Sequence, residues 1–136
     1  MKISTKGRYA LRMMLDLAKN GQEGYVSLRD VSERQDVTVK YLEQIATALS
    51  RAGYIHSQRG NSGGYRLTRE PDGYRVGDIL RATEGSLAPV ACLADEENVC
   101  PRSRECDTLP FWQGLDEAVT RYVDSVTLGD LLNQHK

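Results

Sequence analysis

The stretch Thr38-Val-Lys-Tyr-Leu-Glu-Gln-Ile-Ala-Thr-Ala-Leu-Ser-Arg51 decides the fold, because its apolar residues recur with the period of a helix. Four of them fall at i, i+3, i+4 and i+7 and predict one buried face: Leu42, Ile45, Ala46 and Leu49. Thr38 is a favourable N-cap, and Gly53 is a typical helix stop. The opposite face is polar and basic, with Lys40, Gln44, Thr47 and Arg51. The stretch therefore predicts a helix that packs on one side and presents a polar, basic surface on the other.

Two further helices are predicted before this stretch. Ser27 indicates the start of a short helix that ends near Gln35, and a turn at Asp36 leads directly into the third helix. Ser4 and Thr5 indicate the start of the first helix, which runs to about residue 20 and buries the stripe Ala10, Met14, Leu17 and Ala18. A short helix, a tight turn and a second helix with a basic face form a helix-turn-helix pattern.

A β-hairpin is predicted immediately after the third helix. Residues 54–58 and 65–68 are strand formers, and the turn between them is built from residues that tolerate positive φ. A hairpin in this position is the wing of a winged helix. Arg59 at its tip can reach a DNA groove or phosphates, and a solvated loop arginine is the alternative. With a fourth helix over 76–82, residues 1–85 are predicted to form a winged helix-turn-helix DNA-binding domain, mainly α with a small β-hairpin wing.

The charge of the chain is divided unevenly. The 136 residues have a net charge of −1, but residues 1–75 carry a net +5 and residues 76–136 a net −6. A basic front half indicates a polyanionic partner, although an uneven surface charge is the simpler alternative. No long apolar run follows the polar start of the sequence, so we expect no signal peptide, no membrane-spanning segment and a cytoplasmic protein.

One long helix, 107–126, is predicted in the last third of the chain, capped by Asp107 or Thr108 and with Pro110 in its first turn. Its apolar stripe is wide for a helix outside the compact domain and comprises Phe111, Leu115, Val119, Tyr122 and Val126, with Trp112 and Val123 beside them. A second copy of the chain is the simplest partner for this face, and packing onto the chain's own domain is the alternative. A short helix begins at Thr127, so residues 107–136 are predicted to be a dimerisation helix and a C-terminal helix.

All three cysteines lie in the cysteine segment, residues 86–106. Cys92, Cys100 and Cys106 are spaced C-x7-C-x5-C, which differs from zinc-finger, zinc-ribbon and thioredoxin-type patterns. An odd number of thiols cannot pair off within one chain, and the charged residues around them argue against inert, buried cysteines. Three thiolates in a polar loop can hold an iron–sulfur cluster. A fourth ligand would come from a partner subunit, a small molecule, or one of the flanking carboxylates, Glu105 and Asp107.

Five segments, taken in order, resemble the IscR-type iron–sulfur regulators within the Rrf2 family of bacterial winged-helix transcription factors. They lie at the start, in the third helix, in the wing, in the fourth helix and at the end of the chain: Met1–Ala10, Tyr41–Gln44, Arg59–Tyr65, Val76–Leu80 and Val126–Leu132. Together with three cysteines in the expected place, they cover nearly the whole chain.

This resemblance implies a homodimer that binds a double-stranded DNA operator. It implies major-groove contacts by Thr38, Lys40, Tyr41, Glu43 and Gln44. It also implies a minor-groove contact by Arg59 and phosphate contacts by Lys6 and Arg8. Finally, it implies one iron–sulfur cluster per subunit, with 2Fe–2S favoured and 4Fe–4S as the alternative, on Cys92, Cys100 and Cys106.

Two positions depart from the family pattern. The best-known members have a histidine three residues after the third cysteine, where this sequence has Leu109, which cannot ligate a metal. Related 4Fe–4S sensors take a carboxylate from the partner's first helix, and the position to compare is Arg8, which cannot ligate either. A fourth cluster ligand would therefore have to come from another group.

The predicted function is a dimeric DNA-binding transcriptional regulator, a repressor, whose DNA affinity depends on an iron–sulfur cluster. The signals compatible with it are iron supply, oxidative stress and nitric oxide. A regulator whose cysteines sense oxidants or bind zinc without a cluster is the second hypothesis, and a small iron–sulfur carrier protein is the third. We do not expect an enzyme, because we find no nucleophile–base pair, P-loop or strong carboxylate pair in the sequence.

Overall fold

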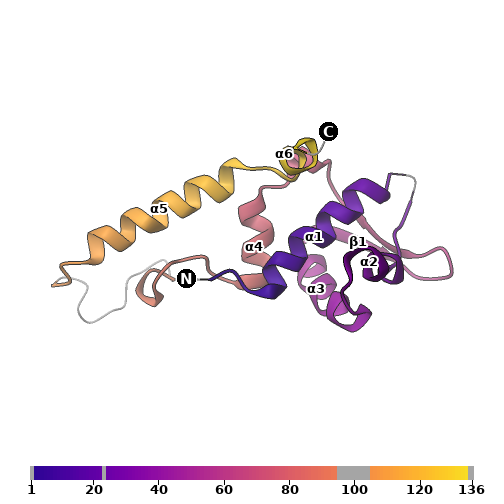
Figure 1. Cartoon of the computed structure of the whole chain (residues 1–136), viewed down its shortest axis with the longest axis horizontal. Coiled ribbons are helices and arrows are strands. Elements are labelled where there is room, and N and C mark those ends of the chain that lie inside the picture. Colours follow the sequence, from indigo (N-terminus) through magenta and orange to yellow (C-terminus); the bar gives the residue numbers. More distant parts are fainter. Residues whose placement is uncertain (1, 23, 95–104, 135–136) are drawn as a thin grey trace.

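The computed structural model describes residues 2–22, 24–94 and 105–134 (Figure 1). In chain order its elements are α1 (Thr5–Asn20), α2 (Leu28–Gln35), α3 (Val39–Arg51), β1 (Ile55–Gln58), β2 (Gly64–Leu67), the 3-10 helix η1 (Pro71–Gly73), α4 (Val76–Glu84), the 3-10 helix η2 (Ala91–Leu93), α5 (Leu109–Ser125) and α6 (Leu128–Asn133). The predicted winged helix-turn-helix class, mainly helical with one antiparallel hairpin, is confirmed. In the described part of the chain, no helix is long and apolar enough to cross a membrane.

Side-chain caps begin most of the helices where the sequence predicted them. The Ser4 hydroxyl accepts a hydrogen bond from the Gly7 backbone N–H, and Ser27 and Thr38 cap α2 and α3 in the same way. Thr108 is the N-cap residue of α5, one of the two that the sequence predicted, but its side chain makes no capping hydrogen bond. Its hydroxyl instead accepts a hydrogen bond from the Trp112 indole at 3.2 Å, one turn further along the helix.

The hydrophobic core is built around α1, which contacts α2, α3, α4, α6 and β2 (Figure 1). Its members come from both ends of the chain: Ala10, Met13, Met14, Leu17, Val26, Val31, Val37, Leu42, Ile45, Ala46, Leu49, Ile55, Tyr74, Ile79 and Leu128. Leu128 of α6 is fully buried, and its backbone N–H donates to the Tyr74 carbonyl at 3.0 Å. The last helix therefore closes the same core as the first one.

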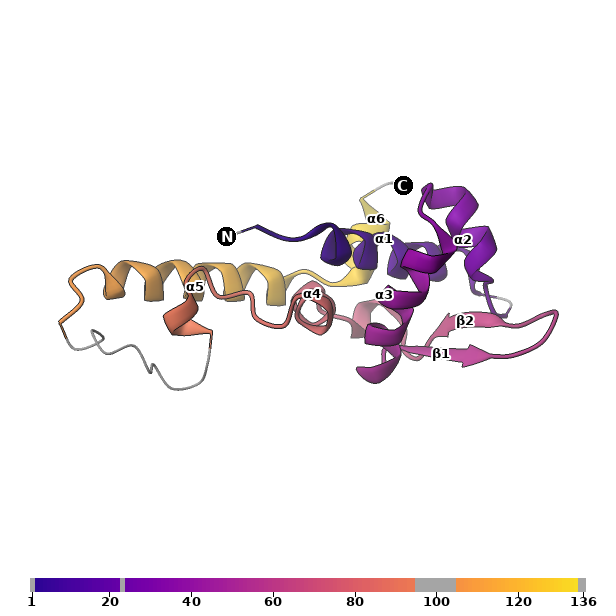
Figure 2. The ribbon, with the colours of Figure 1, turned by 90° about the horizontal axis from the view of Figure 1, so that it is seen from below.

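The wing is a two-stranded antiparallel sheet in which Ile55 faces Leu67 and Gln58 faces Gly64. Val26 extends it through an isolated bridge to Tyr65, with two backbone hydrogen bonds of 2.8 Å. Gly64, at a φ of +151°, lies so close to the Val26 backbone that a β-carbon would overlap it, which explains the glycine at this position. Figure 2 shows the wing and α5 at opposite ends of the molecule.

The long helix α5 extends away from the core and contacts α4 (Figures 1 and 2). Arg81 of α4 joins it to the domain through two bonds to the Asp124 carboxylate, at 2.8 and 3.1 Å. None of the α5 residues, all of which are described, is buried, and Phe111 and Tyr122 are 65% and 70% exposed. Packing against the chain's own domain thus leaves Phe111 and Tyr122 of the apolar stripe exposed, while its other members are half-buried.

Candidate nucleic-acid interface and cysteine segment

The outward face of α3 presents the side chains that the sequence assigned to a DNA major groove. Because the other face of α3 is locked into the core, Lys40, Glu43 and Gln44 project into solvent and are exposed. Thr38 is exposed too, but its hydroxyl accepts a hydrogen bond from the Tyr41 N–H at 3.1 Å. Its first role is therefore to begin the helix.

Tyr41 differs from its neighbours because it is half-buried. Its ring packs edge-on against the Tyr9 ring of α1, with 5.9 Å between the ring centroids. The Arg12 guanidinium in turn lies over the Tyr9 ring, 4.7 Å from its centroid. The start of α3 is thereby attached to α1, and only part of the Tyr41 ring can meet a ligand.

Arg59 lies in the loop between β1 and β2 and is exposed. The base of this wing is held by Tyr74, which is 1% exposed and which was not predicted from the sequence. The Tyr74 hydroxyl donates to the Tyr54 carbonyl at 2.7 Å and accepts from the backbone N–H groups of Thr68 and Arg69 at 2.9 and 3.1 Å. One side chain therefore ties both ends of the hairpin together.

Lys6 and Arg8 occupy the first turn of α1, where Lys6 is half-buried and Arg8 is exposed. The predicted DNA contacts thus come from α1, α3 and the wing. These elements contact one another, since α1 packs on α3 and β2, and α3 packs on β1. The structure therefore places them on one connected framework.

A buried carboxylate, also not predicted from the sequence, holds the turn between α2 and α3. Asp16 of α1 is 2% exposed and accepts two bonds from Arg34, at 2.7 and 2.9 Å, and one from Gln35 at 3.0 Å. Arg12 donates to the Gln35 side chain at 3.1 Å. Burial disfavours the charged form, but the hydrogen bonds from Arg34 and Gln35 outweigh it and lower the pKa of Asp16. An acidic residue between Met14 and Leu17 on a buried stripe was the available signal.

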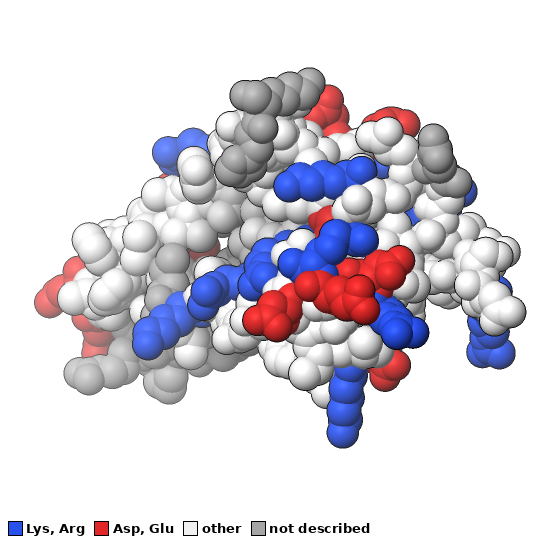
Figure 3. Space-filling model, turned by 45° about the vertical axis from the view of Figure 1, so that its right-hand side comes forward, with Lys and Arg blue, Asp and Glu red and all other residues white. Residues whose placement is uncertain are grey.

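Surface charge is clustered by sign. In the view of Figure 3, Lys and Arg side chains form a line across the molecule, and Asp and Glu side chains lie directly beside it. Positive charge is available for phosphates along a stripe rather than over a whole face.

Two of the three cysteines, Cys92 and Cys106, lie in the described residues. Cys92 lies in η2 and Cys106 precedes α5, and both are half-buried free thiols. Cys100 lies outside the described residues. Within the residues that the structure does describe, no three His, Cys, Asp or Glu side chains are grouped closely enough to hold a metal ion.

The surroundings of Cys106 suit a ligand thiolate. Its sulfur lies 3.3 Å from the Thr108 hydroxyl, and hydrogen bonds from that hydroxyl and from the Thr108 backbone lower the pKa of the thiol. The thiolate is the form that binds iron or zinc, so Cys106 fits the role of a ligand to such a group. Leu109 begins α5 without a ligating atom, while Glu105 and Asp107 are exposed and carry oxygen donors.

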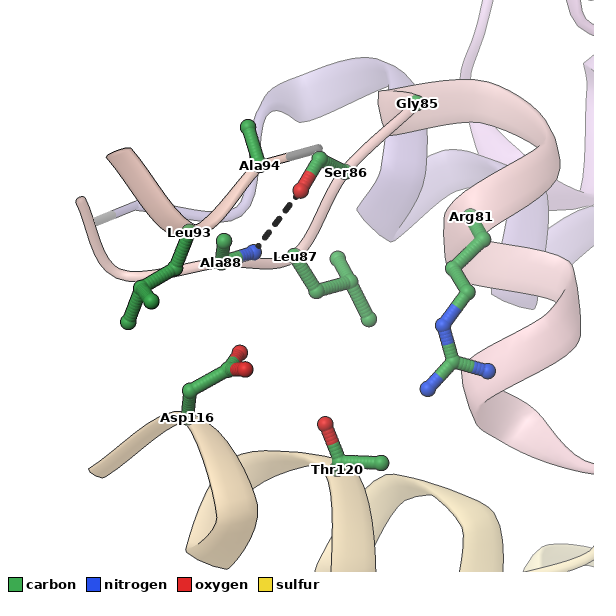
Figure 4. Close-up of a pocket in the computed structure, with 9 residues that line it drawn as sticks. All are labelled: Arg81, Gly85, Ser86, Leu87, Ala88, Leu93, Ala94, Asp116 and Thr120. Atoms are coloured by element: carbon green, nitrogen blue, oxygen red, sulfur yellow. Dashed lines mark hydrogen bonds between the residues drawn. The ribbon is translucent and has the colours of Figure 1, made fainter. Parts of the chain in front are cut away.

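A cavity of about 510 Å³ lies where the cysteine segment meets α5 (Figure 4). Arg81, Asp116 and Thr120 contribute polar groups to it, and Leu87 and Leu93 contribute apolar ones. Leu93 is adjacent to Cys92 in sequence. The cysteine segment and α5 therefore share a surface.

The chain matches the Rrf2 family, described as an iron-dependent transcriptional regulator, over residues 3–134. It is 45% identical over 131 residues to the HTH-type transcriptional regulator CymR of Bacillus subtilis, covering 96% of this chain and 89% of that protein. It is 40% identical over 132 residues to the HTH-type transcriptional regulator IscR of Aliivibrio salmonicida, covering 97% of this chain and 77% of that protein. The solved structure of CymR, the global cysteine regulator of B. subtilis, has a TM-score of 0.79 and 43% identity over 98% of both chains.

Proposed function

Because the chain belongs to the Rrf2 family of DNA-binding transcriptional regulators, which are not enzymes, we propose that it is a dimeric, cytoplasmic repressor controlled by an iron–sulfur cluster. The observation that carries the proposal is the confinement of all three cysteines to one segment between the domain of residues 1–85 and the segment 107–136. A change in that segment can reach both the DNA-binding domain and α5.

DNA recognition is assigned to three elements. The major groove is contacted by Thr38, the N-cap of α3, and by Lys40, Tyr41, Glu43 and Gln44 of α3. Arg59 of the wing contacts the minor groove, and Lys6 and Arg8 contact phosphates. The exposure of all of these side chains except Lys6 and Tyr41, which are half-buried, supports the assignment. Phosphate contacts position the protein, and the α3 side chains supply sequence specificity.

Cys92, Cys100 and Cys106 would hold the cluster, which supplies redox- and iron-sensitive ligation when bound. The lowered pKa of Cys106 supports its role as a thiolate ligand. Since Leu109 has no ligating atom, the fourth position is left to a carboxylate, a partner subunit or a small molecule. A weakly held fourth ligand makes a cluster labile, which suits a sensor that must gain and lose it.

A second copy of the chain is the proposed partner for α5. Val119, Tyr122 and Val123 line an almost wholly apolar groove that continues onto Ile3 and Leu80. Tyr122 and Ile3 are exposed at this groove, and an apolar groove with exposed apolar side chains is a candidate interaction site. Closed two-fold pairing is the commonest form of self-association. A dimer would present two α3 helices to two operator half-sites.

The test is anaerobic purification followed by counts of iron and sulfide per chain and by a visible spectrum. A 2Fe–2S cluster predicts about two irons and two sulfides per chain. Operator affinity is then measured with and without the cluster. Only a difference in affinity between the two forms can transmit a signal, so equal affinities would contradict cluster control without affecting DNA binding.

A cluster-free regulator, in which the cysteines are oxidised or bind zinc, is the second candidate. Leu109 favours it, because the sequence lacks a histidine where a cluster ligand is expected. In that case the purified protein would be colourless, and its DNA affinity would change with thiol oxidation or zinc instead of with iron and sulfide.

A further inference from the structure

The side chain of Glu84 links the end of α4 to the start of α1. Its Oε1 atom accepts a hydrogen bond from the Ser4 backbone N–H at 3.0 Å and another from the Ser4 hydroxyl. The same Ser4 oxygen accepts the capping bond from the Gly7 N–H at 3.3 Å. Since a hydroxyl can donate one bond while accepting another, Glu84, Ser4 and Gly7 form one continuous chain of hydrogen bonds.

Gly7 leaves the room that this carboxylate occupies. It is buried, and a β-carbon at position 7 would overlap the Glu84 Oε1 atom. Glycine is otherwise a poor choice inside a helix, because it is the weakest helix former after proline. A β-carbon at position 7 would therefore displace the Glu84 carboxylate, which is the flexible end of its side chain, from its place beside Ser4.

The hydrogen-bonded turn is the one that carries Lys6 and Arg8. Glu84 is also the last residue of α4, and Gly85 directly after it leads into the cysteine segment. One carboxylate thus lies between the predicted phosphate contacts and the segment that carries the predicted cluster ligands.

The contact is not needed to hold α1 and α4 together. These helices contribute fully buried apolar side chains to one core, among them Ala10, Met14 and Ile79. The Ser4–Glu84 hydrogen bonds are exposed, so water competes for both partners and their net contribution is small beside that of the buried core. A negative charge beside a DNA contact also repels phosphates, so attraction of DNA does not explain it.

We propose that Glu84 is a positioning residue for DNA binding, which holds the first turn of α1 in the orientation that brings Lys6 and Arg8 onto phosphates. The inference rests on the proposed function, and within it on the phosphate contacts of α1. It adds a residue that touches no DNA and acts through Ser4.

The test uses the full chain and a duplex selected from a random pool by the wild-type protein, with affinity measured over a range of salt concentrations. Gly7→Ala displaces the carboxylate without changing the net charge, and Ser4→Ala removes the hydroxyl link. We expect each to weaken binding about tenfold and to reduce the slope of log K against log salt by about 0.9 for each phosphate that the protein no longer binds. Ser4→Thr, which keeps the hydroxyl, should restore wild-type binding.

Gly114→Ala on α5 is the matched control, because no neighbour in the described part of the chain lies within 4 Å of a β-carbon at this position. An unchanged salt slope in Gly7→Ala and Ser4→Ala overturns the inference, even if their melting temperatures fall. Should Gly7→Ala fail to fold, the salt slope of Glu84→Ala decides, because this variant removes the link but keeps the Ser4 cap. If Arg8→Ala lowers the salt slope but Gly7→Ala and Ser4→Ala do not, the inference about Glu84 fails and the α1 phosphate contacts of the proposed function stand. If Arg8→Ala also leaves the slope unchanged, the α1 phosphate contacts of the proposed function fail with it.

Discussion

At the scale of single residues, the Asp16 carboxylate is buried and hydrogen-bonded to both Arg34 and Gln35. Asp16→Asn leaves the Arg34 guanidinium without its counter-charge, at a cost of about 2 kcal/mol in unfolding free energy. The cost stays below that of a fully buried pair because the Arg34 side chain is 39% exposed. Urea denaturation measures it, and Glu33→Gln, which removes an ion pair whose partners are 86% and 70% exposed, should change little.

The same residue predicts a pH dependence. Because folding lowers the pKa of Asp16, its stabilising contribution is complete above the pKa of the unfolded chain, about 3.9, and is lost as pH falls through the lower folded value. The difference in unfolding free energy between wild type and Asp16→Asn should therefore be full at pH 7 and shrink below about pH 4. A difference that grows on acidification would contradict this assignment.

Tyr74 makes the corresponding prediction for the wing. Tyr74→Phe keeps the buried ring but leaves the Thr68 and Arg69 N–H groups without their acceptor and the Tyr54 carbonyl without its donor. We expect a loss of about 1–3 kcal/mol and weaker specific DNA binding, because the base of the wing loosens. Denaturation and operator affinity measure the two effects. Tyr54→Phe is the control, since the carbonyl of Tyr54, and not its hydroxyl, takes part in this cluster.

At the level of elements, one ion pair fastens α5 to α4. Hydrogen bonds from Arg81 lower the pKa of Asp124, and the two side chains are only 32% and 23% exposed. Asp124→Asn should cost about 1 kcal/mol and speed hydrogen exchange in the last turns of α5. Asp116→Asn lies on the same helix and makes no ion pair among the described residues, so it should leave exchange there unchanged.

For the whole molecule, the apolar face of α5 predicts self-association. Tyr122→Glu places a charge in the groove with Val119 and Val123, so sedimentation should show a shift from dimer to monomer and operator affinity should fall. Gln113→Glu, on the opposite side of the helix by its spacing, adds the same charge and should remain dimeric. A Tyr122→Glu protein that stays dimeric would show that another surface mediates assembly.

The helices and the hairpin could be predicted because their signals are local. Ser4, Ser27 and Thr38 each accept a capping hydrogen bond from the backbone N–H three residues further along the chain. The apolar residues from Leu42 to Leu49 recur with the helical period. Thr108 shows the limit of such signals, since its hydroxyl bonds to Trp112 instead of capping α5. Thr38 and Thr108 both precede a helix, but only Thr38 accepts a capping bond, because the Trp112 indole donates to the Thr108 hydroxyl.

The candidate site was predictable only in part. The polar face of α3, the arginine of the wing and the cysteine spacing are all visible in the sequence. The half-burial of Tyr41 was not, because it depends on the position of Tyr9 in another helix. The three-cysteine assignment stays a prediction, since Cys100 lies outside the described residues.

The sequence by itself determined the winged helix-turn-helix class and the separation of a basic front half from an acidic back half. Only the tertiary structure decided which polar side chains hold these parts in place. Asp16 meets Arg34 across 18 positions, Tyr74 meets Tyr54 across 20, and Glu84 meets Ser4 across 80. Helical periods and caps arise within a few residues and leave a pattern in the chain. A hydrogen bond between distant residues leaves none, because the packing of the core brings its two partners together.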